Sequence, residues 1–165
     1  MRPDLVRVAA IAALLAVPCA ALAYGTADHA KRTSLSTEER PFGVKGDPRQ
    51  ASRTITLTTD DTMRYSQSQI RVTQGETITF VVTNKGKLLH ELVLGTEDEL
   101  QRHAQIMRAN PGMHHDEPYM MHVKPGATGR ITWKFTKPGT FLYGCLVAGH
   151  FEAGMKGTIV VAGKK

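Results

Sequence analysis

The chain has 165 residues, a formal net charge of +6 at pH 7 and 41% hydrophobic residues. This length allows one domain of ordinary size with a real core. The positive charge is spread along the chain without an arginine-rich block or interleaved aromatic and basic residues, so we expect no nucleic-acid partner. Beyond the N-terminal region no apolar run is long enough to cross a bilayer, so we expect no membrane span.

Residues 1–23 have the pattern of a secretory signal peptide. Two arginines give a positive start, and the apolar run of residues 8–17 is too short to span a bilayer. The small residues 21–23 form a cleavage site. The sequence therefore predicts export to the periplasm and a mature chain that begins at Tyr24.

Two regions of different composition follow the signal peptide. Residues 24–52 are rich in glycine, proline, serine and threonine and poor in large apolar side chains, which predicts a flexible arm lying on the domain. From 53 to 165 short alternating runs are separated by glycine, proline and asparagine, which predicts an all-β domain built as an antiparallel sandwich or barrel. The expected strands cover residues 54–58, 69–73, 77–82, 89–94, 121–123, 130–135, 141–143 and 156–161.

One short helix is expected to interrupt these strands. Thr96 and Glu99 have the spacing of a capping box, in which each side chain binds a backbone N–H at the helix start. The segment Asn110-Pro111-Gly112 ends the helix. Four residues share one face and are expected to meet the sheet: Leu100, His103, Ala104 and Met107.

A group of metal-ligating residue types lies near the C-terminus. Cys145, His150 and Met155 are separated by four residues each, between the expected strands 141–143 and 156–161. Each of these residues alone is more often part of a core, but a loop between two strands can turn all three side chains toward one point. Together with the upstream imidazole of His90 they match the ligands of a mononuclear electron-transfer copper site, which are one cysteine, two histidines and a weak axial methionine.

The lone thiol supports this interpretation. Cys19 belongs to the predicted signal peptide, so Cys145 is the single cysteine of the expected mature chain. An exported protein with one thiol forms no internal disulfide. Metal ligation gives such a thiol a reason to persist in an oxidising compartment.

The chain resembles the cupredoxins, the fold shared by plastocyanin, azurin and pseudoazurin, and most of all the exported bacterial cupredoxins linked to copper tolerance. The resemblance spans about residues 42–162 and rests on four segments: 42–48, 63–66, 84–91 and 141–157. It implies a Greek-key β-sandwich holding one type 1 copper. The implied ligands are the equatorial His90, Cys145 and His150 and the long axial Met155.

The chain departs from the family next to the first histidine. Many members have Asn at this position, where the side chain supports the cysteine loop, whereas this chain has Glu91. Two roles for Glu91 are open: it orders the imidazole of His90 as a hydrogen-bond acceptor, or it points to solvent.

A second cluster of soft ligands falls within twenty residues. Thioethers and imidazoles together suit Cu(I), so a second, weak copper site near His114 and His115 is a further hypothesis. In the alternative interpretation, the helix members belong to the core and alternate residues of 120–122 face inward along a strand. The cluster contains His103, Met107, Met113, His114, His115, Asp116, Met120, Met121 and His122.

Two functions are compatible with one copper site of this kind. The resemblance implies a periplasmic protein of copper tolerance or homeostasis with one-electron redox capability. The alternative is a soluble electron carrier between periplasmic redox proteins. We expect no enzymatic activity, because no trinuclear or catalytic metal motif accompanies the copper ligands. We expect a monomer whose partners are copper ions and periplasmic redox proteins.

Overall fold

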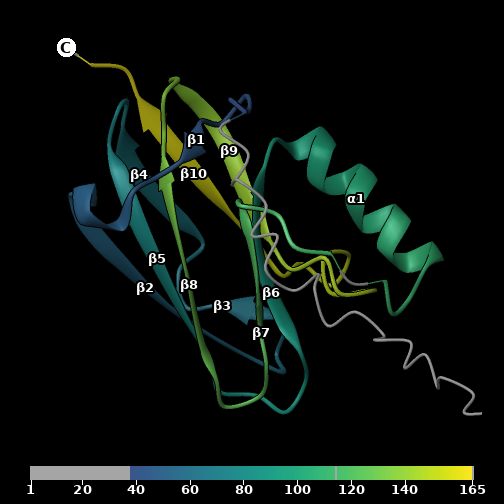
Figure 1. Ribbon diagram of the computed structural model, residues 1–165. Helices are drawn as coiled ribbons and strands as arrows, with labels where there is room; N and C mark the ends of the chain where they lie inside the picture. The colour runs from purple at the N-terminus through teal and green to yellow at the C-terminus, as the bar shows by residue number, and fades with distance from the viewer. Residues whose placement is uncertain (1–37, 114, 165) are drawn as a thin grey trace, which may run out of the picture. The chain divides into compact units, whose positions relative to one another are not determined.

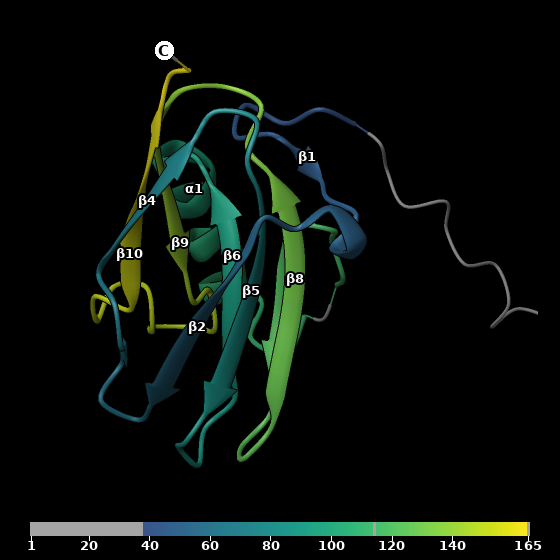
Figure 2. The ribbon, with the colours of Figure 1, turned by 90° about the vertical axis from the view of Figure 1, so that its left-hand side faces the viewer.

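The computed structural model describes residues 38–113 and 115–164. The predicted signal peptide and residues 24–37 of the predicted arm lie outside these residues. Within the described part, ten strands form two five-stranded sheets that pack face to face, and one α-helix lies against the second sheet (Figures 1 and 2). The predicted all-β sandwich with one helical insertion is confirmed.

The two sheets mix antiparallel and parallel pairs. In the first sheet the order is β1 (Val44–Lys45), β8 (Thr128–Lys134), β5 (Thr77–Asn84), β2 (Arg53–Asp60) and β3 (Arg64–Tyr65). In the second it is β4 (Gln69–Thr73), β10 (Lys156–Ala162), β9 (Gly139–Gly144), β6 (His90–Gly95) and β7 (Met120–Val123). The pairs β2–β5 and β4–β10 are parallel. The prediction of an antiparallel sandwich is therefore wrong at these two pairs.

All eight predicted strands are present, and their ends agree with the structure within two residues. The structure adds β1 and β3, each of two residues, and a short 3-10 helix, η1 (Pro48–Gln50). Two-residue strands show no alternation of apolar and polar side chains, which is why the sequence pattern did not predict them.

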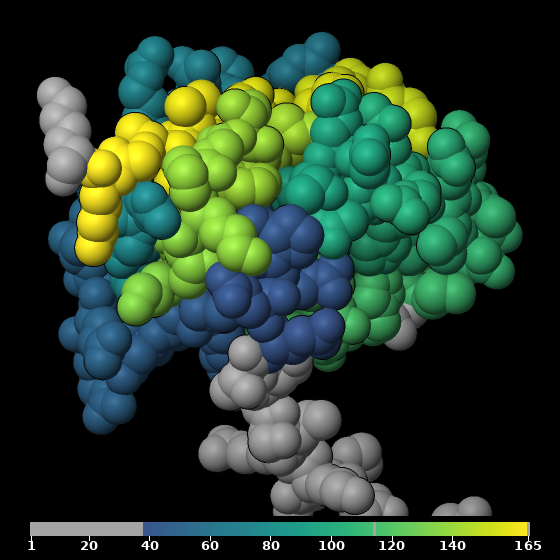
Figure 3. All heavy atoms as spheres, turned by 90° about the horizontal axis from the view of Figure 1, so that it is seen from above, coloured from purple at the N-terminus to yellow at the C-terminus, as the bar shows by residue number. Residues whose placement is uncertain are grey.

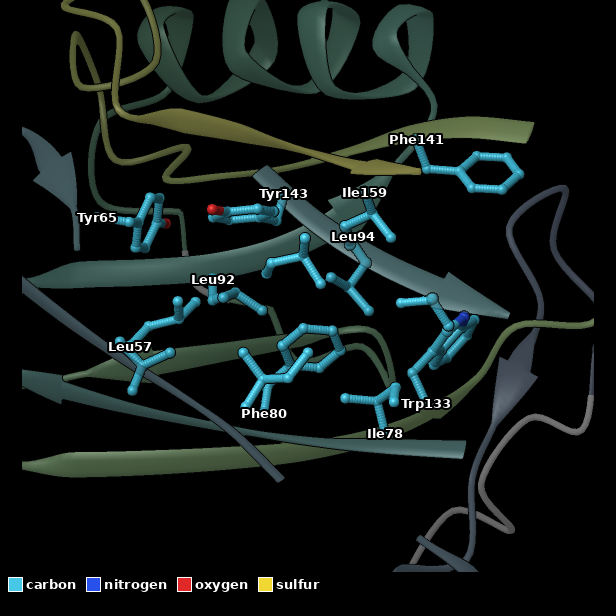
Figure 4. Close-up of a cluster of buried hydrophobic side chains, with 14 of the residues drawn as sticks. Leu57, Tyr65, Ile78, Phe80, Leu92, Leu94, Trp133, Phe141, Tyr143 and Ile159 are labelled. Carbon is cyan, nitrogen blue, oxygen red and sulfur yellow. The ribbon is translucent and has the colours of Figure 1, made fainter. Parts of the chain in front are cut away.

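The core fills the space between the two sheets. Figure 4 shows Leu57, Phe80 and Leu92 facing one another from both sheets, and all three are fully buried. Trp133, predicted to be a core residue, is 1% exposed, and its indole N–H donates to the carbonyl of Phe42 at 2.9 Å. The interior is therefore packed with large side chains, and two of the predicted copper ligands, Cys145 and Met155, belong to this core cluster.

Strand β6 is buried on both faces because helix α1 (Glu97–Ala109) covers the outer side of its sheet (Figure 1). The predicted capping box between Thr96 and Glu99 is present. Leu100, Ala104 and Met107 pack into a second apolar cluster with residues of β6, β7 and the loop after β9. The remaining residue of the predicted helix face, His103, is only half-buried.

Residues 40–50 of the predicted arm are integrated into the sandwich. Phe42 is 1% exposed and stacks on Trp133, with 5.2 Å between the ring centroids. Strand β1 pairs with β8, and Arg40 forms an ion pair with Glu99 at the start of α1. Figure 3 shows this segment, in dark blue, filling the surface between the green residues of α1 and the light-green residues near 135. The folded unit thus includes residues that precede the predicted boundary at 53.

We predict that Phe42→Ala lowers the free energy of unfolding by about 3–5 kcal/mol, because it removes a buried aromatic ring and leaves a cavity beside Trp133. Urea denaturation of the metal-free protein measures the effect. Gln50→Ala, an exposed change in the same segment, serves as the control and is expected to stay within about 0.5 kcal/mol of the parent. Equal stability of the two variants would show that the segment does not contribute to the folded core.

Candidate metal centre

The sandwich brings three of the four predicted ligands to one place. The ligand atoms of His90, Cys145 and His150 all lie within 4.8 Å of one another. His90 is the first residue of β6 and Cys145 follows the last residue of β9. Because β6 and β9 are antiparallel neighbours, the start of one lies beside the end of the other. The loop from β9 to β10 then returns His150 to the same point.

The thiol of Cys145 is enclosed by backbone donors and by one imidazole. Its Sγ accepts a hydrogen bond from the backbone N–H of Glu91 at 3.3 Å and lies 3.3 Å from Nδ1 of His150. Burial raises the pKa of Cys145 to about 12, against the N–H groups of Val147 and Glu91, which lower it. The metal-free site therefore holds a protonated thiol at neutral pH. Since a metal binds the thiolate, copper has to displace this proton.

His90 is fully buried, and both of its ring nitrogens lack a hydrogen bond among the described residues. Oδ1 of Asp61 lies 3.6 Å from Nε2, too far for a hydrogen bond. Buried polar atoms normally have hydrogen-bond partners, so the unpaired nitrogens of His90 call for an explanation. A role of this imidazole as a metal ligand provides one. The residues present therefore fit a copper ion held by nitrogen and sulfur.

His150 is the partly exposed member of the group. Burial and the neighbouring His90 lower its pKa, which favours the neutral ring that binds metals. The ring centroids of His150 and His90 are 5.1 Å apart. Solvent therefore reaches this group of ligands on the His150 side.

Two polar side chains hold the turn that precedes His90. The amide of Asn84, fully buried, donates to the carbonyls of Leu88 and Val123 at 2.7 and 2.9 Å. The carboxylate of Asp61 accepts the backbone N–H groups of Lys87 and Leu88, and these hydrogen bonds lower its pKa. The first residue of β6 is therefore fixed from both sides before any metal binds.

Met155 closes the ligand loop. It is fully buried, its N–H donates to the carbonyl of His150, and its carbonyl accepts from the N–H of Cys145, each at 3.0 Å. Gly149 and Gly154 have φ angles of 85° and 94°, a conformation that favours glycine, and they allow the two turns of the loop. Met155 is thus held next to Cys145 and His150 by the backbone, while its role as axial ligand stays a prediction.

Glu91 occupies neither of the positions considered from the sequence. It is 2% exposed, so it does not point to solvent. Its Oε2 accepts the N–H of Leu146 at 3.3 Å, and its Oε1 lies 2.9 Å from Nε2 of His122 on β7. Its carbonyl accepts a hydrogen bond from the hydroxyl of buried Tyr65. Glu91 therefore ties the residue after Cys145 to the neighbouring strand.

The second cluster of soft ligands separates into different surroundings. Met120 and Met121 are buried on opposite faces of β7, one in each apolar cluster, so they are core residues. His122 is bound to Glu91. His114 lies outside the described residues. The structure does bring His103 and His115 together, with 4.7 Å between their ring centroids.

The sequence and fold comparisons agree on the class of protein. The family described as "Copper binding proteins, plastocyanin/azurin family" matches residues 52–162, so the chain belongs to this family. A relative from Rubrivivax gelatinosus, named copper-resistant cuproprotein CopI, is 45% identical over 98% of this chain and 96% of its own. A protein of the same name from Pseudomonas aeruginosa is 30% identical over 88% of this chain and 96% of its own.

Solved structures show the same fold. Auracyanin from Roseiflexus castenholzii aligns with a TM-score of 0.57 and 24% identity, over 68% of this chain and 98% of its own. Auracyanin B gives a TM-score of 0.59 and 22% identity, over 75% of this chain and 96% of its own. The protein is therefore a cupredoxin in fold and in sequence family. Among the described residues, no helix is long and apolar enough to span a membrane.

We predict that Glu91→Ala destabilises the metal-free protein by about 1–3 kcal/mol, because the buried N–H of Leu146 loses its acceptor. Glu91→Gln keeps an acceptor oxygen and is expected to lower the free energy of unfolding less than Glu91→Ala does. The free energy of unfolding in urea measures both changes. The control is Glu152→Ala, which removes an exposed carboxylate 3.5 Å from Arg108 and is expected to cost at most about 1 kcal/mol. A Glu91→Ala protein as stable as this control would contradict the bridging role.

Proposed function

We propose that the protein binds one type 1 copper ion through His90, Cys145, His150 and Met155 and serves copper tolerance in the periplasm. The observation that carries the proposal is the convergence of two imidazoles and one thiol within 4.8 Å, two of them fully buried. A thiolate and two imidazoles with a weak thioether form the donor set of a type 1 site. The 45% identical relative named a copper-resistant cuproprotein, aligned over almost the whole chain, supports the role in tolerance.

The pattern of burial suits a metal that stays bound while it changes oxidation state. His90 and Cys145 are closed to solvent, and the turn and loop that carry them are held by hydrogen bonds. Copper supplies one-electron redox chemistry when bound, and the protein holds its ligands in one arrangement. The residues around the site therefore favour reversible electron transfer with little rearrangement.

Electron transfer between periplasmic partners is the second candidate function. The partly exposed imidazole of His150 favours it, because this ring offers a path from the buried site to the surface. Leu88, next to the turn before His90, is 46% exposed and adds an apolar contact for a partner. The same copper site serves both functions, so experiments in the cell have to distinguish them.

The ligand set is tested by spectroscopy. The copper-loaded parent is expected to show intense thiolate-to-copper absorption in the visible range, and Cys145→Ser to lose that absorption while the sandwich stays folded. Met155→Leu is expected to retain copper with a changed reduction potential, because the axial ligand mainly tunes the site. Far-ultraviolet circular dichroism controls for folding. A visible band that survives in Cys145→Ser would refute the assignment.

The role in the cell is tested with chromosomal variants grown at rising copper concentrations. If the protein serves copper tolerance, Cys145→Ser is expected to lower survival as much as deletion of the gene. Gln105→Ala, an exposed change on α1, provides a control that keeps the site. Unchanged copper survival together with a lower respiratory rate in the Cys145→Ser strain would instead identify an electron carrier.

A further inference from the structure

A second pair of imidazoles lies on parts of the chain that the proposed copper site does not use. His103 belongs to helix α1, and His115 to the segment between α1 and β7. Their ring centroids are 4.7 Å apart, and the ring planes are tilted by 41°. Both side chains are partly exposed, so a solvated ion has access to the pair.

One nitrogen of this pair has no partner within residues 38–113 and 115–164. Nδ1 of His115 is buried and makes no hydrogen bond to any described residue. A buried ring nitrogen in this state points to a ligand, because native proteins pair almost all of their buried polar atoms. Packing of the two imidazole rings against each other does not explain why this buried nitrogen lacks a hydrogen-bond partner.

The electrostatics around His103 favour binding of a cation by its neutral ring. Burial and, second, the nearby His115 lower the pKa of His103. At neutral pH the ring of His103 therefore carries a free lone pair, which is the form that ligates metals. Two imidazoles this close together repel each other when both carry a proton. One metal ion that binds both rings avoids this repulsion.

The neighbouring soft ligands do not join the pair. Met107, Met120 and Met121 are buried in the apolar clusters, and His122 is engaged by Glu91. The donor set is therefore nitrogen from two imidazoles, without a thiolate. Among divalent first-row ions, imidazole sites bind Cu²⁺ most tightly.

We propose that His103 and His115 form a second copper site, which binds Cu²⁺ through two imidazoles with water at the remaining positions. Among the described residues, the partner of His115 in this site is His103 on the helix. The site shares no ligand with the His90–Cys145–His150 group, so either assignment can fail without the other.

The proposal is tested by titrating the mature chain with Cu²⁺ and recording electron paramagnetic resonance spectra. The parent is expected to bind two ions. The second ion gives a signal with the wide hyperfine splitting of nitrogen- and oxygen-bound Cu²⁺ and without thiolate absorption. His103→Ala and His115→Ala are each expected to lower the affinity for the second ion at least about tenfold. Loss of a residue that only hydrogen-bonds to a metal ligand already lowers metal affinity ~10–100-fold.

Two matched variants make the assignment specific. His114→Ala removes the neighbouring histidine, and Gln105→Ala changes an exposed residue of the same helix, so both are expected to keep the second ion. The narrow type 1 signal reports that each variant is folded. His103→Gln and His115→Gln replace the alanine variants if either of those fails to fold, and are expected to lose the second ion in the same way.

Several outcomes would overturn the proposal. The first is a parent protein that binds only one copper ion. The second is a wide signal that survives in both the His103 and the His115 variants. The third is a wide signal that is lost in His114→Ala but kept in His103→Ala. The Cys145→Ser protein separates this site from the proposed function. It is expected to lose the type 1 signal and to keep a wide one. Since His90 and His150 remain and bind Cu²⁺ without a thiolate, the Cys145→Ser protein is compared with and without His103→Ala. A wide signal that His103→Ala leaves unchanged in this background would show that the pair is no independent site.

Discussion

The candidate site depends on the antiparallel pairing of β6 with β9. This pairing places His90, at the start of one strand, beside Cys145, just after the end of the other. Neither residue can be displaced without disturbing a ladder of backbone hydrogen bonds in the middle of a sheet. The helix α1 covers the outer face of the same two strands, so both faces are buried and the register has little freedom. The pairing of the two strands thus fixes the positions of the predicted ligands His90 and Cys145. The loop between β9 and β10 then brings His150 to the same place.

Three polar side chains, buried Asn84 and Glu91 and exposed Asp61, bind the backbone on either side of these two strand ends. Asn84 and Asp61 bind the backbone of the turn before His90, while Glu91 binds the backbone after Cys145. Burying a carboxylate is costly unless it is paired, and Glu91 meets this condition through the N–H of Leu146 and the imidazole of His122. The network therefore stabilises the two chain segments that carry predicted ligands, at positions where an apolar side chain would leave backbone carbonyls or N–H groups unpaired.

Burial also sets the chemistry of the metal-free state. The thiol of Cys145 stays protonated, with a pKa near 12, so the thiolate that reacts with oxidants is scarce. The same burial leaves the ring nitrogens of His90 without a hydrogen bond from the part of the chain that the structure describes, which favours any ligand that can bind them. Cys145 is in this way protected until a metal displaces its proton. The side of the site closest to solvent belongs to His150.

The sequence by itself determined eight of the ten strands, the capped helix and a set of residue types that suits copper, because these depend on local alternation, local capping and residue chemistry. The spacing of Cys145, His150 and Met155 was sufficient to suggest a copper site, and three of the four predicted ligands are close together, counting His90. Only the tertiary structure decided features that depend on contacts between distant residues. These include the parallel pairs β2–β5 and β4–β10, the burial of Phe42 against Trp133, the bridge from Glu91 to His122 and the pairing of His103 with His115. Sequence patterns report which face a side chain takes within its own element, whereas its partner across the fold follows from how the elements pack.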